Sequence, residues 1–253
     1  MIEVRNITVQ TRAGLALLKD LSVTFPPGKI HAIIGPNGSG KTTLIKAISG
    51  LTRPSSGDVL INGQKVHTRS PIEIASQLSY VEAEHHTPFA YTVMDTVLWG
   101  RWPQHQGHPR QTDYDAARVA AGRLGLSAML NRTMTTLSLG ERKKTHLAKS
   151  LASESPYLVW DEPLAPLDIR ASLEVMATLK DLASEGATVL ISLHDITLAP
   201  RYADTITILD DKKVTWHGSP GDSVCLSTLA KVFGVRVDRV DKDTAWTISL
   251  TPT

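Results

Sequence analysis

The stretch Gly35-Pro36-Asn37-Gly38-Ser39-Gly40-Lys41-Thr42 decides the fold. It matches in full the pattern G-x-x-x-x-G-K-[ST], in which glycines allow backbone N–H groups to turn inward around phosphate oxygens. In this pattern Lys41 supplies a positive charge to the outer phosphates, and the hydroxyl of Thr42 is a ligand for Mg²⁺. A helix that begins directly after the loop adds the positive end of its dipole. The stretch therefore predicts a site for a nucleotide and its Mg²⁺.

The residues on both sides of this loop have the character that the pattern requires. Lys29–Ile34 is a short apolar run typical of a buried strand, and Thr43–Ser49 carries apolar side chains at helical spacing. Upstream, Ile2–Val9 and Leu15–Phe25 alternate like strands, and Pro26-Pro27-Gly28 forms a turn. We expect a strand–loop–helix unit next to a pair of N-terminal strands.

Strands and helices alternate again in the last third of the chain. Tyr157–Trp160 and Thr188–Leu193 are apolar strands, and Asp168–Glu185 is a helix between them. Thr205–Leu209 and Lys213–Trp216 form a hairpin. This half of the sequence therefore predicts a continuation of the α/β core.

The middle of the chain has a different pattern. Strand-forming residues are rare between residues 84 and 155, and we expect a helix over Asp113–Leu124 and a loop over Gly100–Arg110, which contains two prolines. The chain is thus predicted to be one domain of residues 1–253. Its expected parts are a core of residues 1–83 and 156–225, a helical subdomain of residues 84–155 and a C-terminal extension of residues 226–253.

Three residues with acid–base chemistry directly follow predicted strands. Asp161 and Glu162 follow one strand and His194 follows another. Because ligands bind at the carboxyl ends of strands in open parallel sheets, we expect all three side chains near the phosphate loop. Asp161 is suited to Mg²⁺, Glu162 to activation of an attacking water, and His194 to the γ-phosphate.

A second candidate anion site lies at Ser138-Leu139-Gly140-Glu141. Ser138 and Glu141 form the S-x-x-E capping box that opens a helix, and Gly140 leaves room at its N-terminus. An ordinary helix start explains the local pattern equally well. Two chains arranged head to tail would use this site and the phosphate loop on one nucleotide.

Composition excludes several classes of protein. Among 253 residues, 27 Lys and Arg face 25 Asp and Glu, so the chain lacks the strong positive charge of a nucleic-acid-binding protein. The one cysteine, Cys225, has no partner for an internal disulfide, which fits a reducing compartment. The apolar runs are far shorter than the roughly 18 residues of a membrane span, and the polar N-terminus is unlike a signal peptide. Contact with a membrane is therefore expected only through a partner protein.

Two clusters have simpler explanations than a ligand site. His85, His86, His105 and His108 lack the cysteine or carboxylate that would complete a convincing metal site. Lys143 and Lys144 are interpreted as a solvated helix face rather than a nucleic-acid patch.

Taken together, these motifs resemble those of the ATP-binding-cassette (ABC) family. GPNGSGKTT is similar to its Walker A motif, LSLGE to its signature, LVWDEP to its Walker B motif with the catalytic glutamate, Ala165-Pro166-Leu167-Asp168 to its D-loop, and His194 to its switch histidine. The resemblance implies a P-loop NTPase (RecA-like) α/β core with an N-terminal antiparallel β-sheet and an inserted helical subdomain. It further implies an ATP hydrolase that forms a head-to-tail homodimer around two ATP molecules.

The resemblance also assigns site residues. The nucleotide-binding residues are Gly35, Pro36, Asn37, Gly38, Ser39, Gly40, Lys41, Thr42, Thr43, Ser138, Gly140, Glu141 and Asp168; the catalytic residues are Glu162 and His194; and the Mg²⁺ ligands are Thr42 and Asp161.

Two further stretches are similar to one group within the family. Val93 followed by Gly100-Arg101-Trp102-Pro103, and the segment Leu229–Val235, resemble the ATPase subunits of importers for iron-siderophores, haem and cobalamin. This implies a peripheral position on the cytoplasmic face of the inner membrane, a permease bound near residues 84–101, and indirectly a substrate-binding protein. The alternative functions are an export ATPase and a non-transport regulator with weak hydrolysis. The alternative explanation for Trp99 and Trp102 is ordinary packing within the helical subdomain.

The sequence departs from the family pattern at three places. Ala83 stands where the family has a glutamine, and Leu139 replaces the first glycine of the signature. No aromatic residue stands near Thr11–Gly14 to stack on adenine, and the guanidinium of Arg12 is a candidate replacement.

Overall fold

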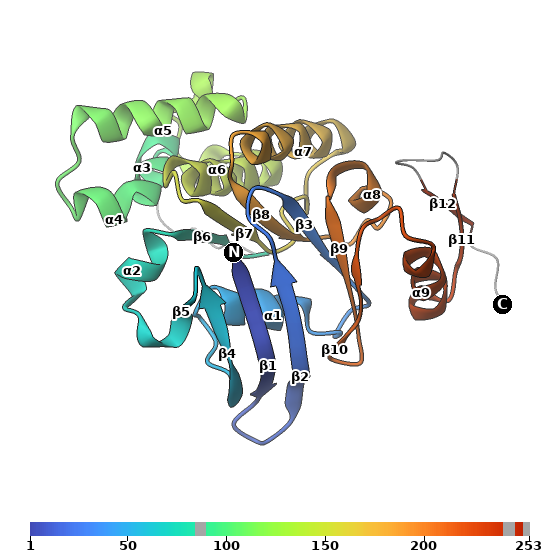
Figure 1. The fold of residues 1–253 in the computed structure, drawn as a ribbon. Helices are drawn as coiled ribbons and strands as arrows, with labels where there is room; N and C mark the ends of the chain where they lie inside the picture. The colour runs from blue at the N-terminus through green and yellow to red at the C-terminus, as the bar shows by residue number, and fades with distance from the viewer. Residues whose placement is uncertain (84–89, 240–245, 250–253) are drawn as a thin grey trace.

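Two β-sheets enclose helix α1 (Lys41–Ile48) in the structure, a computed structural model that describes residues 1–83, 90–239 and 246–249 (Figure 1). The four-stranded antiparallel sheet has the order β2-β1-β4-β5, with β1 (Ile2–Gln10), β2 (Ala16–Phe25), β4 (Ser56–Ile61) and β5 (Gln64–Lys65). The six-stranded sheet has the order β10-β9-β3-β8-β7-β6, with β3 (Ile30–Ile34), β6 (Leu78–Val81), β7 (Tyr157–Trp160), β8 (Thr188–Ser192), β9 (Thr205–Asp210) and β10 (Lys213–Gly218). Near the C-terminus, β11 (Arg236–Arg239) pairs with β12 (Trp246–Ser249).

Helices α5 (Gln111–Arg123), α6 (Leu139–Ala152) and α7 (Ile169–Ser184) lie on the other side of the six-stranded sheet from the four-stranded sheet (Figure 1). The remaining α-helices are α2 (Pro71–Ala75), α3 (Val93–Leu98), α4 (Trp102–His105), α8 (Ala199–Tyr202) and α9 (Ser223–Phe233). Short 3₁₀ helices are η1 (Val66–Thr68), η2 (Trp99–Arg101), η3 (Ser127–Met129) and η4 (Met134–Thr136). Helices α3 to α6 follow one another between β6 and β7, so the α/β alternation is interrupted there.

Strand direction sets up the functional edge of the molecule. Strand β3 pairs in parallel with β8 and β9, and β7 pairs in parallel with β6 and β8. The carboxyl ends of these five strands therefore lie at one edge of the sheet. The residues that follow β3, β7, β8 and β9 are brought together there although they are far apart in sequence.

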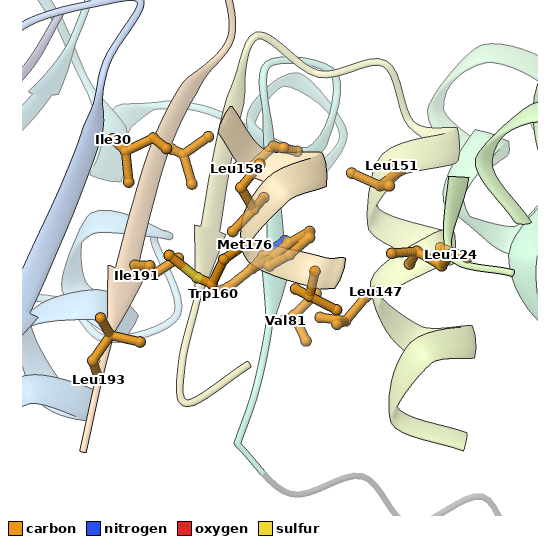
Figure 2. Close-up of a cluster of buried hydrophobic side chains, with 14 of the residues drawn as sticks. Ile30, Val81, Leu124, Leu147, Leu151, Leu158, Trp160, Met176, Ile191 and Leu193 are labelled. Atoms are coloured by element: carbon orange, nitrogen blue, oxygen red, sulfur yellow. The ribbon is translucent and has the colours of Figure 1, made fainter. Parts of the chain in front are cut away.

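The central strands are buried on both faces. In β3, Ile30, Ala32 and Ile34 pack into one hydrophobic cluster with α6 and α7, whereas Ile33 packs into the other with α1 and the four-stranded sheet. Trp160 of β7 is fully buried, and Figure 2 shows it in the first cluster with side chains from α6, α7 and β8. Its indole Nε1 donates to Ser150 Oγ at 2.7 Å, which satisfies the polar atom of this buried ring.

Two local expectations need correction. The helix expected over Thr43–Ser49 begins earlier, at Lys41, because Gly40 turns the chain directly into it. The segment Gly100–Arg110 is not a loop throughout: η2 covers Trp99–Arg101 and α4 covers Trp102–His105. Pro103 lies in the first turn of α4, where the missing N–H of proline disturbs no helical hydrogen bond.

Candidate active site

Helix α1 begins with unsatisfied backbone donors. Gly40 at its N-cap has φ 106°, and no side chain caps the helix. The first N–H groups of a helix have no intrahelical acceptors, so they are available to an anion. Gly40 also lies against β2, where an added Cβ would be 2.6 Å from Leu18 Cδ2. The positive φ, which side chains disfavour, and this crowding against β2 together explain the second glycine of the pattern.

Lys41 is buried inside the loop that it follows. The residue is only 6% exposed, and its Nζ donates to the carbonyl oxygens of Gly35 at 2.7 Å and Pro36 at 3.1 Å. Burial lowers the pKa of Lys41, while the nearby carboxylates of Glu162 and Asp161 act in the opposite direction. Both hydrogen-bond acceptors are neutral, so the ammonium charge is available to phosphate.

Asp161 and Glu162 are fixed by a serine on the neighbouring strand. Ser192 Oγ donates to Asp161 Oδ1 at 2.6 Å and accepts the backbone N–H of Glu162 at 2.8 Å. Asp161 is 1% exposed, and its Oδ2 has no hydrogen-bond partner among the described residues. A buried carboxylate oxygen without a donor is an orphan that a cation or its water would satisfy.

His194 and Glu162 are in contact. The distance from His194 Nε2 to Glu162 Oε1 is 2.6 Å, and the imidazole is half exposed. The pair stands at the ends of β8 and β7, so the strand-end positions that motivated the sequence prediction do bring these side chains together.

One cavity of about 230 Å³ joins the loop to Glu162 at the end of β7. It is lined by Leu17, Asn37, Gly38, Gly40, Lys41, Thr42, Thr43, Glu162 and Lys212. A cation, a row of helix-start amides and a carboxylate that contacts an imidazole thus face one space. This set of groups suits the binding of a polyphosphate and the activation of water beside its last phosphate.

Ser138, Gly140 and Glu141 do not line this cavity. Ser138 caps α6, with Glu141 N donating to Ser138 Oγ at 3.2 Å and Ser138 N donating to Glu141 Oε2 at 2.7 Å. The backbone hydrogen bond from Ser138 lowers the pKa of Glu141. Leu139 beside them is 63% exposed. The expected capping box is therefore confirmed, and it presents an open surface rather than a contact to the chain's own phosphate loop.

Asp168 also has a capping role in the structure. Its Oδ1 accepts the backbone N–H of Ala171 at 2.7 Å, at the start of α7. The adjacent Leu167 lies near α6, because a Cβ on Gly140 would be 3.6 Å from Leu167 Cδ2. Asp168 and the capping box are thus near each other at the surface.

The interpretation of Lys143 as part of a solvated helix face is wrong. The residue is 4% exposed, and its Nζ donates to the backbone carbonyls of Ala83 at 2.9 Å and Glu82 at 3.1 Å. Burial lowers its pKa to about 8, against the effect of nearby carboxylates. The helical period contained the signal, because Lys143 stands four residues before the buried Leu147 and shares its face. Lys144 forms an ion pair with Glu174, with Nζ–Oε2 at 3.0 Å.

Ser192 was also missed. The signal was a hydroxyl residue within an otherwise apolar strand, two positions before His194. A fully buried hydroxyl needs a hydrogen-bond partner, and here the partners are the two acidic residues at the end of β7.

Several expectations concern residues at the edge of the described structure. Glu84, His85 and His86 lie outside the described residues. Within the described ranges, no group of three or more His, Cys, Asp or Glu side chains is arranged to hold a metal ion.

Arg12 is exposed in the turn between β1 and β2. None of the helices in the described part of the chain has the length and hydrophobicity needed to span a membrane.

Comparison with known proteins adds the family. The model of the ABC transporter family matches residues 18–165. The petrobactin import ATP-binding protein YclP of Bacillus subtilis is 33% identical over 238 residues, which are 94% of each chain. The hemin import ATP-binding protein HmuV of Agrobacterium fabrum is 35% identical over 243 residues, 93% of this chain and 92% of its own.

Solved structures agree with the fold. A transporter described as an ABC transporter of the metal-chelate type, in an inward-facing conformation, has a TM-score of 0.82 and 25% identity, covering 99% of this chain and 98% of its own. The dimeric ATP-binding cassette MJ0796 bound to ADP and phosphate has a TM-score of 0.79 and 25% identity, covering 87% of this chain and 98% of its own. With its phosphate loop, strand-end acidic pair and histidine in one place, the chain belongs to the ABC transporter family.

Proposed function

We propose that this chain is the ATP-hydrolysing subunit of an importer for an iron chelate, haem or a cobalamin-type compound. The observation that carries the proposal is the single cavity shared by Lys41 and Glu162, with His194 in contact with Glu162. The direction and cargo class rest on the relatives, whose names describe petrobactin, hemin and cobalamin import. The petrobactin and hemin relatives match this chain over nearly the whole of both chains, whereas this chain spans 63% of the length of the cobalamin relative.

In the proposed reaction, each site residue has a distinct task. Lys41 exchanges its carbonyl partners for the outer phosphates of ATP, and the uncapped start of α1 binds phosphate oxygens. Glu162 accepts a proton from the attacking water and orients it, while His194 holds Glu162 and the γ-phosphate in register. Ser192 positions both strand-end acids rather than touching ATP.

The residues present fit a Mg²⁺ ion. Thr42, in the first turn of α1, and Asp161, with its orphan Oδ2, would hold the ion directly or through water. When bound, Mg²⁺ neutralises charge on the β- and γ-phosphates. Asp161 is suited to this role because its other oxygen is already fixed by Ser192.

We further propose that two copies bind ATP head to tail. The capping box of Ser138 and Glu141 is open at the surface and would meet the γ-phosphate held by the loop of the second copy, with Gly140 and Asp168 beside it. Two anion sites that are separate within one chain then serve one nucleotide. The dimeric cassette among the similar structures supports the formation of a dimer.

The proposed organisation places the chain against a permease. The core would be residues 1–83 and 156–225, the helical subdomain residues 84–155 and the C-terminal extension residues 226–253. Permease subunits would bind near residues 84–101, on the cytoplasmic face of the inner membrane, and a substrate-binding protein would act from the other side. The exposed Trp99 and Trp102 near this region favour a partner surface.

The test combines hydrolysis with transport. The purified chain should hydrolyse ATP only with Mg²⁺, and should co-purify with the permease encoded beside it. Vesicles containing the complex and the binding protein should accumulate a labelled iron chelate, haem or cobalamin when ATP is supplied. Failure of the chain to bind any permease when the two are co-expressed would favour the non-transport alternative, and ATP-driven movement in the opposite direction would favour an exporter.

A further inference from the structure

The turn between β9 and β10 borders the phosphate loop. Strand β9 is the parallel neighbour of β3 on the side away from β8, with Ile34 opposite Ile208. An added Cβ on Gly35 would lie 2.3 Å from the carbonyl oxygen of Leu209. The backbone just before the turn therefore touches the first residue of the loop.

Two contacts with β2 hold this turn in place. The backbone N–H of Lys19 donates to the carbonyl oxygen of Lys212 at 3.0 Å, and Lys19 Nζ is 3.2 Å from Asp211 Oδ2. Lys212 has φ 68°, in the left-handed region that side chains disfavour. These contacts hold the backbone of Lys212 and thereby set the direction in which its side chain leaves the turn.

Lys212 lines the nucleotide cavity together with Lys41, Thr43 and Leu17. Among the residues that the structure describes, no carboxylate forms an ion pair with Lys212, whereas the neighbouring Asp211 is paired with Lys19. The cavity therefore contains a second lysine, and none of the described carboxylates is paired with its charge.

Strand order determines which part of a nucleotide Lys212 faces. Along the edge the order is β9, β3, β8 and β7, at a spacing of about 4.8 Å per strand. His194 and Glu162 follow β8 and β7, on one side of the loop, and Lys212 follows β9, on the other side. If the γ-phosphate lies toward Glu162, the α-phosphate and sugar lie toward Lys212.

We propose that the Lys212 ammonium binds the sugar-proximal phosphate of the nucleotide, and so contributes affinity shared by ATP and ADP. This inference rests on the proposed function, because it takes the cavity to be the ATP site. It gives a chain without an aromatic residue near Thr11–Gly14 an additional contact at the nucleoside end of the site.

The test is the affinity for ATP and ADP, each measured by isothermal titration calorimetry on the full chain without Mg²⁺. In Lys212→Met the charge is lost and the stem is kept, and both affinities should fall roughly five- to tenfold, as for a lost charge-assisted hydrogen bond. The ratio of the two affinities should stay unchanged. Lys213→Met, an exposed neighbour on β10, is the matched control and should bind like the wild type.

Lys212→Gly separates folding from binding. Glycine adopts φ 68° without strain, so this variant should melt at or above the wild-type temperature and still lose the same affinity as Lys212→Met. Wild-type affinity in either variant would overturn the inference, as would a loss confined to ATP, because that would place the lysine at the γ-phosphate. If the wild type itself binds neither nucleotide, the proposed function fails and this inference fails with it.

Discussion

His194 Nε2 lies 2.6 Å from Glu162 Oε1, and the hydroxyl that holds the Glu162 backbone comes from Ser192, two residues before that histidine. The end of β8 thus positions the glutamate twice, once through its main chain and once through its side chain. A shift of one strand relative to the other would change both contacts together. The acid–base geometry is therefore a property of the β7–β8 pairing.

Replacing Glu162 by glutamine should separate binding from hydrolysis. Glu162→Gln keeps the size of the side chain and removes its basicity, so the ATPase rate should fall by roughly 10²–10⁴-fold. Nucleotide affinity should be retained, and size-exclusion chromatography with ATP should show a trapped dimer. Glu185→Gln, an exposed acid at the end of α7, is the control and should leave the rate unchanged. Wild-type turnover in Glu162→Gln would remove Glu162 from the catalytic step.

Ser192→Ala should lower both stability and activity. The change leaves Asp161 Oδ1 without its donor and the buried Glu162 N–H without its acceptor, which costs about 1–3 kcal/mol in the free energy of unfolding. Urea denaturation measures the stability, and Mg²⁺ titration of the ATPase measures the site. Ser192→Thr retains the hydroxyl and should restore part of both properties. An unchanged Mg²⁺ dependence in Ser192→Ala would argue against a positioning role.

Lys143→Met should loosen the end of β6 while preserving the rest of the fold. The methionine fills the same buried space but cannot donate to the carbonyls of Glu82 and Ala83. Hydrogen–deuterium exchange of the peptide that contains residues 82 and 83 should therefore become faster, with little change in β3 or β8. Lys144→Met, which loses only an exposed ion pair, is the control. Equal exchange in the two variants would contradict the prediction.

Stability should fall on acidification because of His31 in β3. Burial lowers its pKa to about 4, although the carbonyl of Pro26 acts in the opposite direction, and the unfolded value is near 6.5. The unfolded chain thus binds the proton more readily between these values. The contribution of neutral His31 to the free energy of unfolding is fully present above about pH 6.5. It falls by on the order of 3 kcal/mol as the pH is lowered to 4.

Chemical denaturation at several pH values measures this effect. His146 has its pKa lowered to about 4, also mainly by burial, and contributes in the same direction. The slope of unfolding free energy against pH should become shallower in His31→Gln, and shallower again when His146 is replaced as well. A slope that is the same in His31→Gln as in the wild type would show that His31 is not the group responsible.

Gly100→Ala should disturb the contact between η2 and α6. An added Cβ would lie 1.9 Å from the carbonyl oxygen of Lys149, inside a helix that cannot move alone. We expect the free energy of unfolding to fall by about 1–3 kcal/mol, which is typical of overpacking. Gly107→Ala is not a matched control because Gly107 has φ 96°, so Gly122→Ala on α5, where the nearest atom is 3.4 Å away, is used instead.

Periodicity and strand-end chemistry predicted most of the fold and the central part of the site. The strand over Tyr157–Trp160 has the predicted bounds. The sequence also predicted that Glu162 and His194 lie close together, because both follow strands whose carboxyl ends share one edge of a parallel sheet. Helical spacing placed Lys143 on the same face as Leu147, but it could not show that the ammonium finds its acceptors at the end of β6, because that contact depends on where α6 meets β6. Nor could it show that Ser192 joins two acids on another strand, since that contact depends on tertiary register.

The sequence predicted the hairpin turn at Lys212, but its position beside the phosphate loop could not be predicted, for a related reason. In the sequence it is a polar hairpin tip, and only the position of β9 beside β3 brings it to the phosphate loop. The segment Gly100–Arg110 was mistaken for a loop because its glycine and proline residues are typical of turns, whereas tight packing on α6 and a first-turn proline make part of it helical.

Helix α6 combines two features in a single element. Its first residues present the capping box to the outside, and one turn later Lys143 reaches the end of β6. The helix runs from Leu139 to Ala152, with no glycine after Gly140 to absorb a bend. In the head-to-tail dimer proposed above, the helix end that faces the second copy is therefore the same end that holds the backbone of residues 82 and 83 through Lys143.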